Sequence, residues 1–188
     1  MDENQLLAAV GAGDTACFER LYAAYERRVL QYARTIVRDI GTAEEVVVDT
    51  MLAVWDGARR FNRTSRVSTW IFGIARHKAL DAVRRSGRAS RAGKHVALQE
   101  AAEVASEEPT PESAADKSSV RAALEVAFEG LSPEHREILY LAFFEDLPYE
   151  EIANLLSLPL NTVKTRVYYA KENLKTRIER PTAMELIS

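Results

Sequence analysis

The chain has 188 residues, of which 47% are hydrophobic, and it carries a formal net charge of -3. This size allows one or two small domains, and the apolar content excludes a disordered protein. No apolar run reaches the roughly 18 to 20 residues of a membrane helix, and the N-terminus is acidic where a secretory signal is basic, so we expect a cytoplasmic protein without membrane insertion. The single cysteine, Cys17, excludes an internal disulfide and a cysteine-rich zinc site, and we expect no metal and no cofactor.

Charge is distributed unevenly along the chain. Residues 59–94 hold eleven Lys or Arg and one acid, Asp81, whereas residues 99–116 hold six acids and no base. Such segregation suggests basic surfaces for a polyanion and acidic surfaces for other partners.

The first part of the chain is expected to be helical, since strand signals are nearly absent and apolar residues recur at three- and four-residue steps. A first helix covers residues 14–39, with Asp14 as its N-cap. A second helix begins at Thr42, which is placed to form a capping box with Glu45, and runs to Trp55. The whole chain is predicted to be all-α.

A third helix is unusually basic and carries the segment "STWIFGIARHKALDAVRRSGR". We expect Ser65 or Ser68 to cap it. Its buried stripe would be formed by Ile71, Ile74, Ala75, Ala82 and Val83. Another side combines an aromatic ring with cationic groups, namely Trp70, Arg76, His77, Lys78, Arg84, Arg85 and Arg88.

This mixture of ring and guanidinium groups suits phosphates and an unstacked base, which predicts a surface for single-stranded DNA. The alternative is that Trp70 belongs partly to the core and that the arginines are only solvated. The preceding loop offers Asn62, Arg63 and Ser65, which either line a pocket for a flipped base or are simply solvated. Asp81 has the helical spacing to pair with one of the nearby arginines, Arg84 or Arg85.

Composition divides the chain into two small helical domains. Residues 93–117 are rich in Ala, Glu, Ser and Pro, which predicts a flexible acidic linker. We therefore expect an N-terminal segment over 1–13, a first domain over 14–92, a second domain over 118–180 and a tail over 181–188.

The second domain contains the pattern of a helix-turn-helix. A helix over 149–156 is followed by "SLPLN" and by a helix that begins at Asn161 or Thr162. Upstream, Ser132 and Pro133 form an N-cap and a first helical position. Side chains suited to base edges and phosphates lie on the outward side of the last helix: Thr162, Lys164, Thr165, Arg166, Tyr168, Tyr169 and Lys171. The alternative is a helical bundle whose basic face is solvated.

Three segments together resemble the extracytoplasmic-function group of bacterial sigma factors. They are "AEEVVVDTMLAVW", "RVSTWIFGIARHKALDAVRR" and "LSPEHREILYLAFFEDLPYEEIANLLSLPLNTVKTRV", in the order and at the spacing of that family. The resemblance implies that the first domain is a region 2 that binds the RNA polymerase clamp helices and melts the -10 promoter element. It implies that the second is a region 4 that reads the -35 element and holds the polymerase flap. Core RNA polymerase, promoter DNA and an anti-sigma factor are the implied partners.

The resemblance also assigns residues to these partners. It implies clamp contacts by Glu44, Glu45, Asp49 and Trp55. It implies -10 contacts by Asn62, Arg63, Ser65, Ser68, Trp70, Arg76, His77, Lys78, Arg84, Arg85 and Arg88. It implies -35 contacts by Thr162, Lys164, Thr165, Arg166, Tyr168, Tyr169 and Lys171.

Some positions depart from the family pattern. Thr42 and Val48 replace an acid and a polar residue of the clamp-binding motif, so Thr42 is either a helix cap or a phosphorylation site that restores the charge. His77 stands in place of a usual Asn and Tyr169 in place of a frequent Arg, which predicts altered base preferences at both promoter elements.

Other functions remain as alternatives. One is a helix-turn-helix regulator that binds duplex DNA as a dimer, and another is a sigma-like protein that needs Thr42 phosphorylation or does not initiate transcription. An enzyme has little support, because the histidines are scattered and no Gly-rich phosphate loop is present. We expect the free protein to bind promoter DNA weakly, since its two modest basic surfaces are joined by a flexible tether and only core polymerase fixes their separation.

Overall fold

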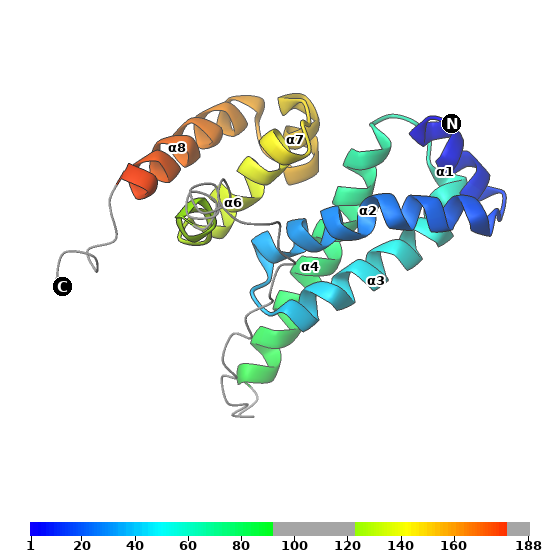
Figure 1. Cartoon of the computed structure of the whole chain (residues 1–188), viewed down its shortest axis with the longest axis horizontal. Helices are drawn as coiled ribbons and strands as arrows, with labels where there is room; N and C mark the ends of the chain where they lie inside the picture. The colour runs from blue at the N-terminus through cyan, green and yellow to red at the C-terminus, as the bar shows by residue number, and fades with distance from the viewer. Residues whose placement is uncertain (92–122, 180–188) are drawn as a thin grey trace, which may run out of the picture.

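The computed structural model describes residues 1–91 and 123–179, the side chains of 88–91 excepted, and the regular structure in both ranges is helical (Figure 1). The predicted linker over 93–117, the tail over 181–188 and the side chain of Arg88 lie outside the described residues. In the described ranges, none of the helices combines the length and the apolar character that crossing a membrane requires.

The first unit, residues 1–91, is a small helical bundle. It contains α1 (Glu3–Gly11), α2 (Thr15–Ile36), α3 (Ile40–Gly57), the 3-10 turn η1 (Ala58–Arg60) and α4 (Val67–Arg91). Helices α2, α3 and α4 pack against one another, and α1 lies against α2 and η1. Leu21, Val29, Met51 and Phe72 are fully buried between them, and this apolar burial is the main stabilising term of the unit.

Local capping sets where these helices begin. The carboxylate of Asp14 accepts a hydrogen bond from the Cys17 amide at 2.9 Å, which confirms the predicted cap of α2. At α3 the prediction was wrong: Asp39 is the N-cap and accepts from the Thr42 amide at 2.7 Å. Since Asp39 takes this role, α3 begins at Ile40 and Thr42 is the third residue of the helix.

The buried stripe of α4 differs in part from the prediction. Ile71, Ala75 and Ala82 are buried, but Val83 is 45% exposed, and Phe72 faces the core in full. The buried stripe runs through Phe72, Ala75, Ala79 and Ala82, at three- and four-residue steps. Val83 lies beside this stripe, on the outer side of the helix. Because α4 begins at Val67, Ser68 lies inside the first turn of the helix, so it is not the N-cap that was predicted as one of two candidates.

The second unit, residues 123–179, carries the helix-turn-helix. A helical turn over 123–129 precedes α6 (Pro133–Leu139), the π-helical turn η2 (Tyr140–Phe144), α7 (Tyr149–Leu156) and α8 (Leu160–Glu179). Ser132 caps α6 and Pro133 opens it, as predicted. Ile152 from α7 and Val163 from α8 are completely buried in the core of this unit.

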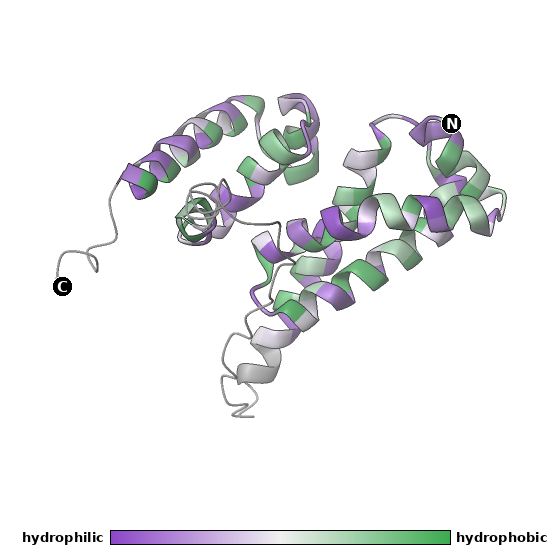
Figure 2. Ribbon diagram, in the orientation of Figure 1, coloured by the Kyte–Doolittle hydropathy of each residue, from purple (hydrophilic) through white to green (hydrophobic). Residues whose placement is uncertain are grey.

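The turn between α7 and α8 requires an unusual backbone. Ser157 has φ 56° and ψ 46°, the left-handed conformation that most often belongs to glycine at a helix C-terminus. The amide of Leu158 donates to the carbonyl of Ala153 at 2.9 Å and so closes the end of α7. This tight turn sets the crossing of α8 over α7, which leaves hydrophilic residues along the length of α8 (Figure 2).

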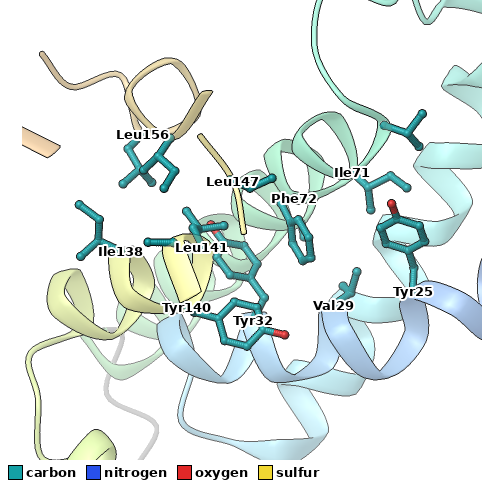
Figure 3. Packing of buried hydrophobic residues seen from close by; sticks show 14 of the residues in the cluster. Tyr25, Val29, Tyr32, Ile71, Phe72, Ile138, Tyr140, Leu141, Leu147 and Leu156 are labelled. Atoms are coloured by element: carbon teal, nitrogen blue, oxygen red, sulfur yellow. The ribbon is translucent and has the colours of Figure 1, made fainter. Parts of the chain in front are cut away.

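The two units share one continuous core. Helix α6 packs on α2, and α7 packs on α4. Between them the rings of Tyr32, Phe72 and Tyr140 form a buried cluster, with centroids 5.2 Å apart for Tyr32 and Phe72 and 5.8 Å apart for Tyr32 and Tyr140 (Figure 3). The prediction of two small helical domains is confirmed, and within the described residues the two units are in contact in a closed arrangement.

Candidate nucleic-acid interface

An acidic and partly apolar face lies on α3. Glu44 and Glu45 are exposed, and Asp49 is half-buried one helical turn further on. Beside them Val48 and Leu52 are exposed by 50% and 57%. The structure thus brings three of the four predicted polymerase contacts to one face, and the apolar neighbours make that face suitable for a protein partner.

Trp55 and Thr42 lie at the two ends of this face and are more enclosed. The ring of Trp55 packs edge-to-face on Phe18 of α2, with 5.0 Å between centroids, so Trp55 contributes to the core as well as to the surface. The Thr42 hydroxyl donates to the Asp39 carboxylate at 2.6 Å, and the residue is half-buried. This bond lowers the pKa of Asp39 and keeps a negative charge at the start of α3, where the helix dipole favours it.

The loop before α4 has a defined local structure. The side-chain oxygen of Asn62 accepts from the amide and the hydroxyl of Thr64, at 3.2 and 2.8 Å, which forms an Asx turn. Arg63 adopts a positive φ of 59° in this turn and is exposed, and Ser65 is half-buried. A cavity of about 580 Å³ lies between Phe61, Arg63 and the side chains of α1.

Trp70 is divided between core and surface. Its ring lies 5.2 Å from that of Phe61, and a Cβ on Gly57 would come within 3.0 Å of its Cζ2 atom. The residue remains half-buried, so one part of the ring packs on Phe61 and on Gly57 at the end of α3, and the rest is open to solvent. Both interpretations of Trp70, as partial core and as a binding surface, fit this position.

The C-terminal part of α4 carries the accessible basic residues. His77, Arg84 and Arg85 are exposed, and Lys78 is half-buried. Arg84 forms an ion pair with Asp81 three residues earlier, which confirms the predicted pairing. Figure 1 shows the last turns of α4 extending away from the second unit.

The N-terminal part of α4 is covered by the second unit. The Arg76 guanidinium Nε donates to Oε1 of Glu137 in α6 at 2.9 Å. The Thr69 hydroxyl donates to the Glu151 carboxylate of α7, and Ser68 is only 7% exposed. Of the predicted -10 residues, Ser68 is thus buried and Arg76 is paired with Glu137 in this arrangement.

Glu137 is the centre of a buried hydrogen-bond network that the sequence analysis did not identify. Its Oε1 atom accepts from Arg76 and also from the Tyr32 hydroxyl at 2.8 Å. Burial raises the pKa of the Tyr32 phenol well above its usual value, and the charge of Glu137 adds to that rise, so the phenol stays a donor.

A second group of polar contacts, centred on Arg28 and Glu145, also joins the two units. Arg28 Nε donates to Oε2 of Glu145 at 3.1 Å, and the Glu145 side chain is 2% exposed. The Arg28 guanidinium lies 4.3 Å from the centre of the Tyr25 ring, and the Tyr140 hydroxyl donates to the Arg28 carbonyl at 2.9 Å. Burial, then the nearby Glu145 charge, raises the pKa of Tyr140.

The outward side of α8 is open along its length. Lys164, Thr165 and Lys171 are exposed, Tyr168 and Tyr169 more than half so, and Thr162 and Arg166 are half-buried. The structure thus places the predicted -35 residues along the solvent-facing side of α8, around its buried positions Val163, Val167 and Ala170.

A hollow of about 420 Å³ opens where α8 begins. It is lined by Thr162, Thr165, Arg166 and Tyr169 and, from α6, by His135. The sequence analysis did not select His135, because the chain places it 27 residues before Thr162. Free amides at the start of α8 and the cationic side chain of Arg166 make this hollow suitable for a phosphate.

Both units match known protein families. A family model described as Sigma-70 region 2 matches residues 21–89, and one described as Sigma-70, region 4 matches residues 121–174. RNA polymerase sigma-H factor of Pseudomonas aeruginosa is 24% identical over 181 residues, which cover 94% of each chain. ECF RNA polymerase sigma factor RpoE of Cereibacter sphaeroides is 28% identical over 163 residues, which cover 86% of each chain.

Two solved structures share the fold. CnrH in complex with the cytosolic domain of CnrY aligns with a TM-score of 0.66 at 21% identity, over 96% of this chain and 99% of that one. The sigma factor RpoE in complex with the anti-sigma factor NepR from Bartonella quintana aligns with a TM-score of 0.68 at 22% identity, over 88% and 98%. The likeness extends over both helical units.

Proposed function

Because this chain belongs to the extracytoplasmic-function group of the sigma-70 family, whose members direct transcription initiation, we propose a division of that task among its surfaces. The observation that carries the proposal is the separation of an acidic face on α3 from basic faces on α4 and α8. The acidic face suits a protein partner, and the two basic faces suit DNA. We propose that the protein works in the cytoplasm as a regulatory factor without catalytic chemistry of its own.

The face on α3 is proposed to bind the clamp helices of core RNA polymerase. Glu44, Glu45 and Asp49 would supply charge, and exposed Val48 and Leu52 would supply apolar area. Trp55 would contribute the part of its half-buried ring that Phe18 leaves open. Thr42 is proposed as a regulatory position, because a phosphate there would add negative charge at this end of the face.

The -10 element is proposed to bind along the loop over 61–66 and α4. Melting requires a base to leave the duplex, and the open part of Trp70 offers it an aromatic surface. Asn62, Arg63 and Ser65 would surround that base, and the adjoining cavity has room for one. Phosphates of the same strand would meet the hydroxyl of Ser68 and the cationic residues along α4: Arg76, His77, Lys78, Arg84, Arg85 and Arg88.

We propose that α8 lies in the major groove of the -35 element. Lys164, Thr165 and Tyr169 would reach base edges, while Arg166 and Thr162 would hold a phosphate in the hollow at the start of the helix. His135 is proposed as a further contact to that phosphate. Tyr168 and Lys171 would meet the DNA backbone on either side of these residues.

Two protein partners are proposed for the second unit. Phe143 and Phe144 are exposed by 56% and 62%, and such aromatic area suits the polymerase flap or an anti-sigma factor. An anti-sigma partner is supported by the complex of RpoE with NepR, which shares this fold.

The test is transcription from a pool of promoter fragments of the protein's own genome. We expect specific transcripts that need both core RNA polymerase and this protein. The test variant is Lys164→Ala on α8. The control variant is Glu19→Gln on α2, at an exposed position outside the proposed sites. The first should abolish initiation at promoters that depend on the -35 element, and the second should not. Specific duplex binding in the absence of polymerase, with no transcripts, would instead favour the helix-turn-helix regulator.

A further inference from the structure

We propose that the free protein is closed on itself, with carboxylates of the second unit occupying the groups of α4 that hold the phosphates of the -10 strand. This proposal rests on the proposed function, because it concerns the regulation of the same site. It assigns to the second unit a role in addition to reading DNA: a mimic of the strand that the first unit binds.

The first observation is the arrangement of charge across the contact. Glu137 binds Arg76, Glu145 binds Arg28, and Glu151 binds Arg66. In each pair the acid belongs to the second unit and the arginine belongs to the first. The distance between nitrogen and oxygen is 2.9 Å for Arg76, the length at which arginine also binds phosphate oxygens, and 3.5 Å for the looser ion pair of Arg66.

The second observation is that the acids reach groups at the start of α4 as well. The carboxylate of Glu151 accepts from the Thr69 hydroxyl, and its Oε2 atom also lies 3.4 Å from the Arg66 amide. A hydroxyl and an amide beside an arginine, at the start of a helix, form a common phosphate-binding arrangement. One carboxylate therefore takes the position that a backbone phosphate would occupy next to Trp70.

The third observation is that the contact is packed and not merely electrostatic. Tyr32, Phe72 and Tyr140 exclude water beneath the ion pairs, and the Glu137 side chain is 11% exposed (Figure 3). A pair enclosed in this way is weakly screened by salt. A nucleic-acid strand can replace Glu137 at the Nε atom of Arg76 only after α6 has moved away.

The closed arrangement affects the proposed surfaces unequally. It occupies Arg76 and Thr69, while the acidic face of α3 and the outward face of α8 stay open. Core polymerase can thus bind α3 before the units separate, whereas the -10 strand binds after they separate. Weak promoter binding by the free protein then follows from occupied arginines and not only from a loose tether.

The size of the effect follows from the population of the open form. If the closed form outnumbers the open one by ten to one, the apparent affinity of region 2 for a strand falls by about tenfold. Removing the carboxylates should therefore raise the apparent affinity for the strand by about tenfold, although the strand-binding residues themselves are unchanged.

The experiment compares full-length protein with the variant Glu137→Gln/Glu151→Gln. The probe is a fluorescein-labelled single-stranded DNA of random sequence, about twelve nucleotides long, followed by anisotropy without polymerase. The matched control is Glu19→Gln/Glu26→Gln, which makes the same change in net charge at exposed positions of α2. Small-angle X-ray scattering of each free protein reports whether the units separate.

We expect the variant to bind the strand about tenfold more tightly and to have a larger radius of gyration, with the control unchanged in both. A folded variant that matches wild type in affinity and radius overturns the proposal, as does a control that gains as much affinity as the variant. Glu151→Gln alone, at the more exposed pair, replaces the double variant if Glu137→Gln prevents folding. Core-dependent transcription by wild type is measured in parallel: its absence refutes the proposed function, while the scattering result still decides whether the protein is closed.

Discussion

Replacing Tyr32 by Phe tests the buried network most directly, because it removes one oxygen and leaves the ring in place. The Tyr32 hydroxyl is buried and donates to Glu137 at 2.8 Å, and a hydrogen bond to a charged acceptor contributes about 1.5 to 3 kcal/mol. Arg76 continues to hold the same carboxylate oxygen, so Glu137 keeps a partner. We therefore expect a loss near the lower end, about 1 to 2 kcal/mol of unfolding free energy.

The assay is urea unfolding of wild type, Tyr32→Phe, Glu137→Gln and the double variant. If the hydroxyl acts through Glu137, the cost of Tyr32→Phe should fall by at least half in the Glu137→Gln background. Strictly additive costs, or a Tyr32→Phe variant as stable as wild type, would refute the network as described.

The same phenol predicts a loss of stability in alkali. The folded protein raises the pKa of Tyr32 and Tyr140 above the unfolded value of about 10, chiefly by burial. Above that pH the unfolded chain loses protons that the folded chain retains, so stability is full below about pH 10 and declines as pH rises toward the folded pKa values. Unfolding followed between pH 8 and 11 should show this decline, and Tyr32→Phe should make it less steep.

Three further changes test other parts of the molecule. Ser157→Gly should raise unfolding free energy by about 1 kcal/mol, since glycine takes the left-handed backbone of Ser157 without strain; an unchanged melting temperature would contradict this. Thr42→Glu should strengthen binding to core polymerase by up to about 1 kcal/mol, or roughly fivefold, because the third helical position accepts an acid, whereas Thr15→Glu on α2 should leave that affinity unchanged. Tyr169→Arg should shift one position of the -35 element toward guanine by about 1 to 3 kcal/mol, measured as transcription from a -35 library, and an unaltered preference would exclude Tyr169 from base contact.

Much of the fold could be predicted because local signals were unambiguous. Asp14 was identified as a cap because apolar residues at helical spacing follow it, and Ser132 because Pro133 follows it directly at the first helical position. The start of α3 was misplaced because Asp39 and Thr42 are both good caps, three residues apart, and only the backbone of Ile40 and Gly41 decides between them. The closed contact could not be predicted, since Arg76 and Glu137 are 61 residues apart in sequence.

The sequence does contain one signal for that contact. Glu137 precedes Tyr140 and Leu141 by three and four residues, so it lies on the apolar stripe of its own helix. Arg76 lies four residues after Phe72 and has the same kind of position on α4. A charged residue on a buried stripe is costly unless it is paired, so two such residues of opposite sign in different units indicate that the stripes meet. The positions of Glu137 and Arg76 therefore indicate that α6 and α4 belong to units in contact, but they do not give the distance or angle between the helices.

A switch between closed and open forms requires that the contact be weak enough to open. Buried ion pairs contribute little net stability, because the cost of removing both charges from water offsets most of their attraction. The aromatic pairs add about 0.5 to 1.5 kcal/mol each beyond their burial. Arginine pairs such as Arg76 with Glu137, and Arg34 with Glu129 at 3.8 Å, therefore specify how the units meet, and the ring cluster of Tyr32, Phe72 and Tyr140 supplies most of the attraction. Removing one carboxylate still weakens the contact strongly, because it leaves a partly buried arginine without its partner. Binding of α3 to polymerase does not disturb that cluster, so the separation of the units must come from contacts that polymerase makes with the second unit.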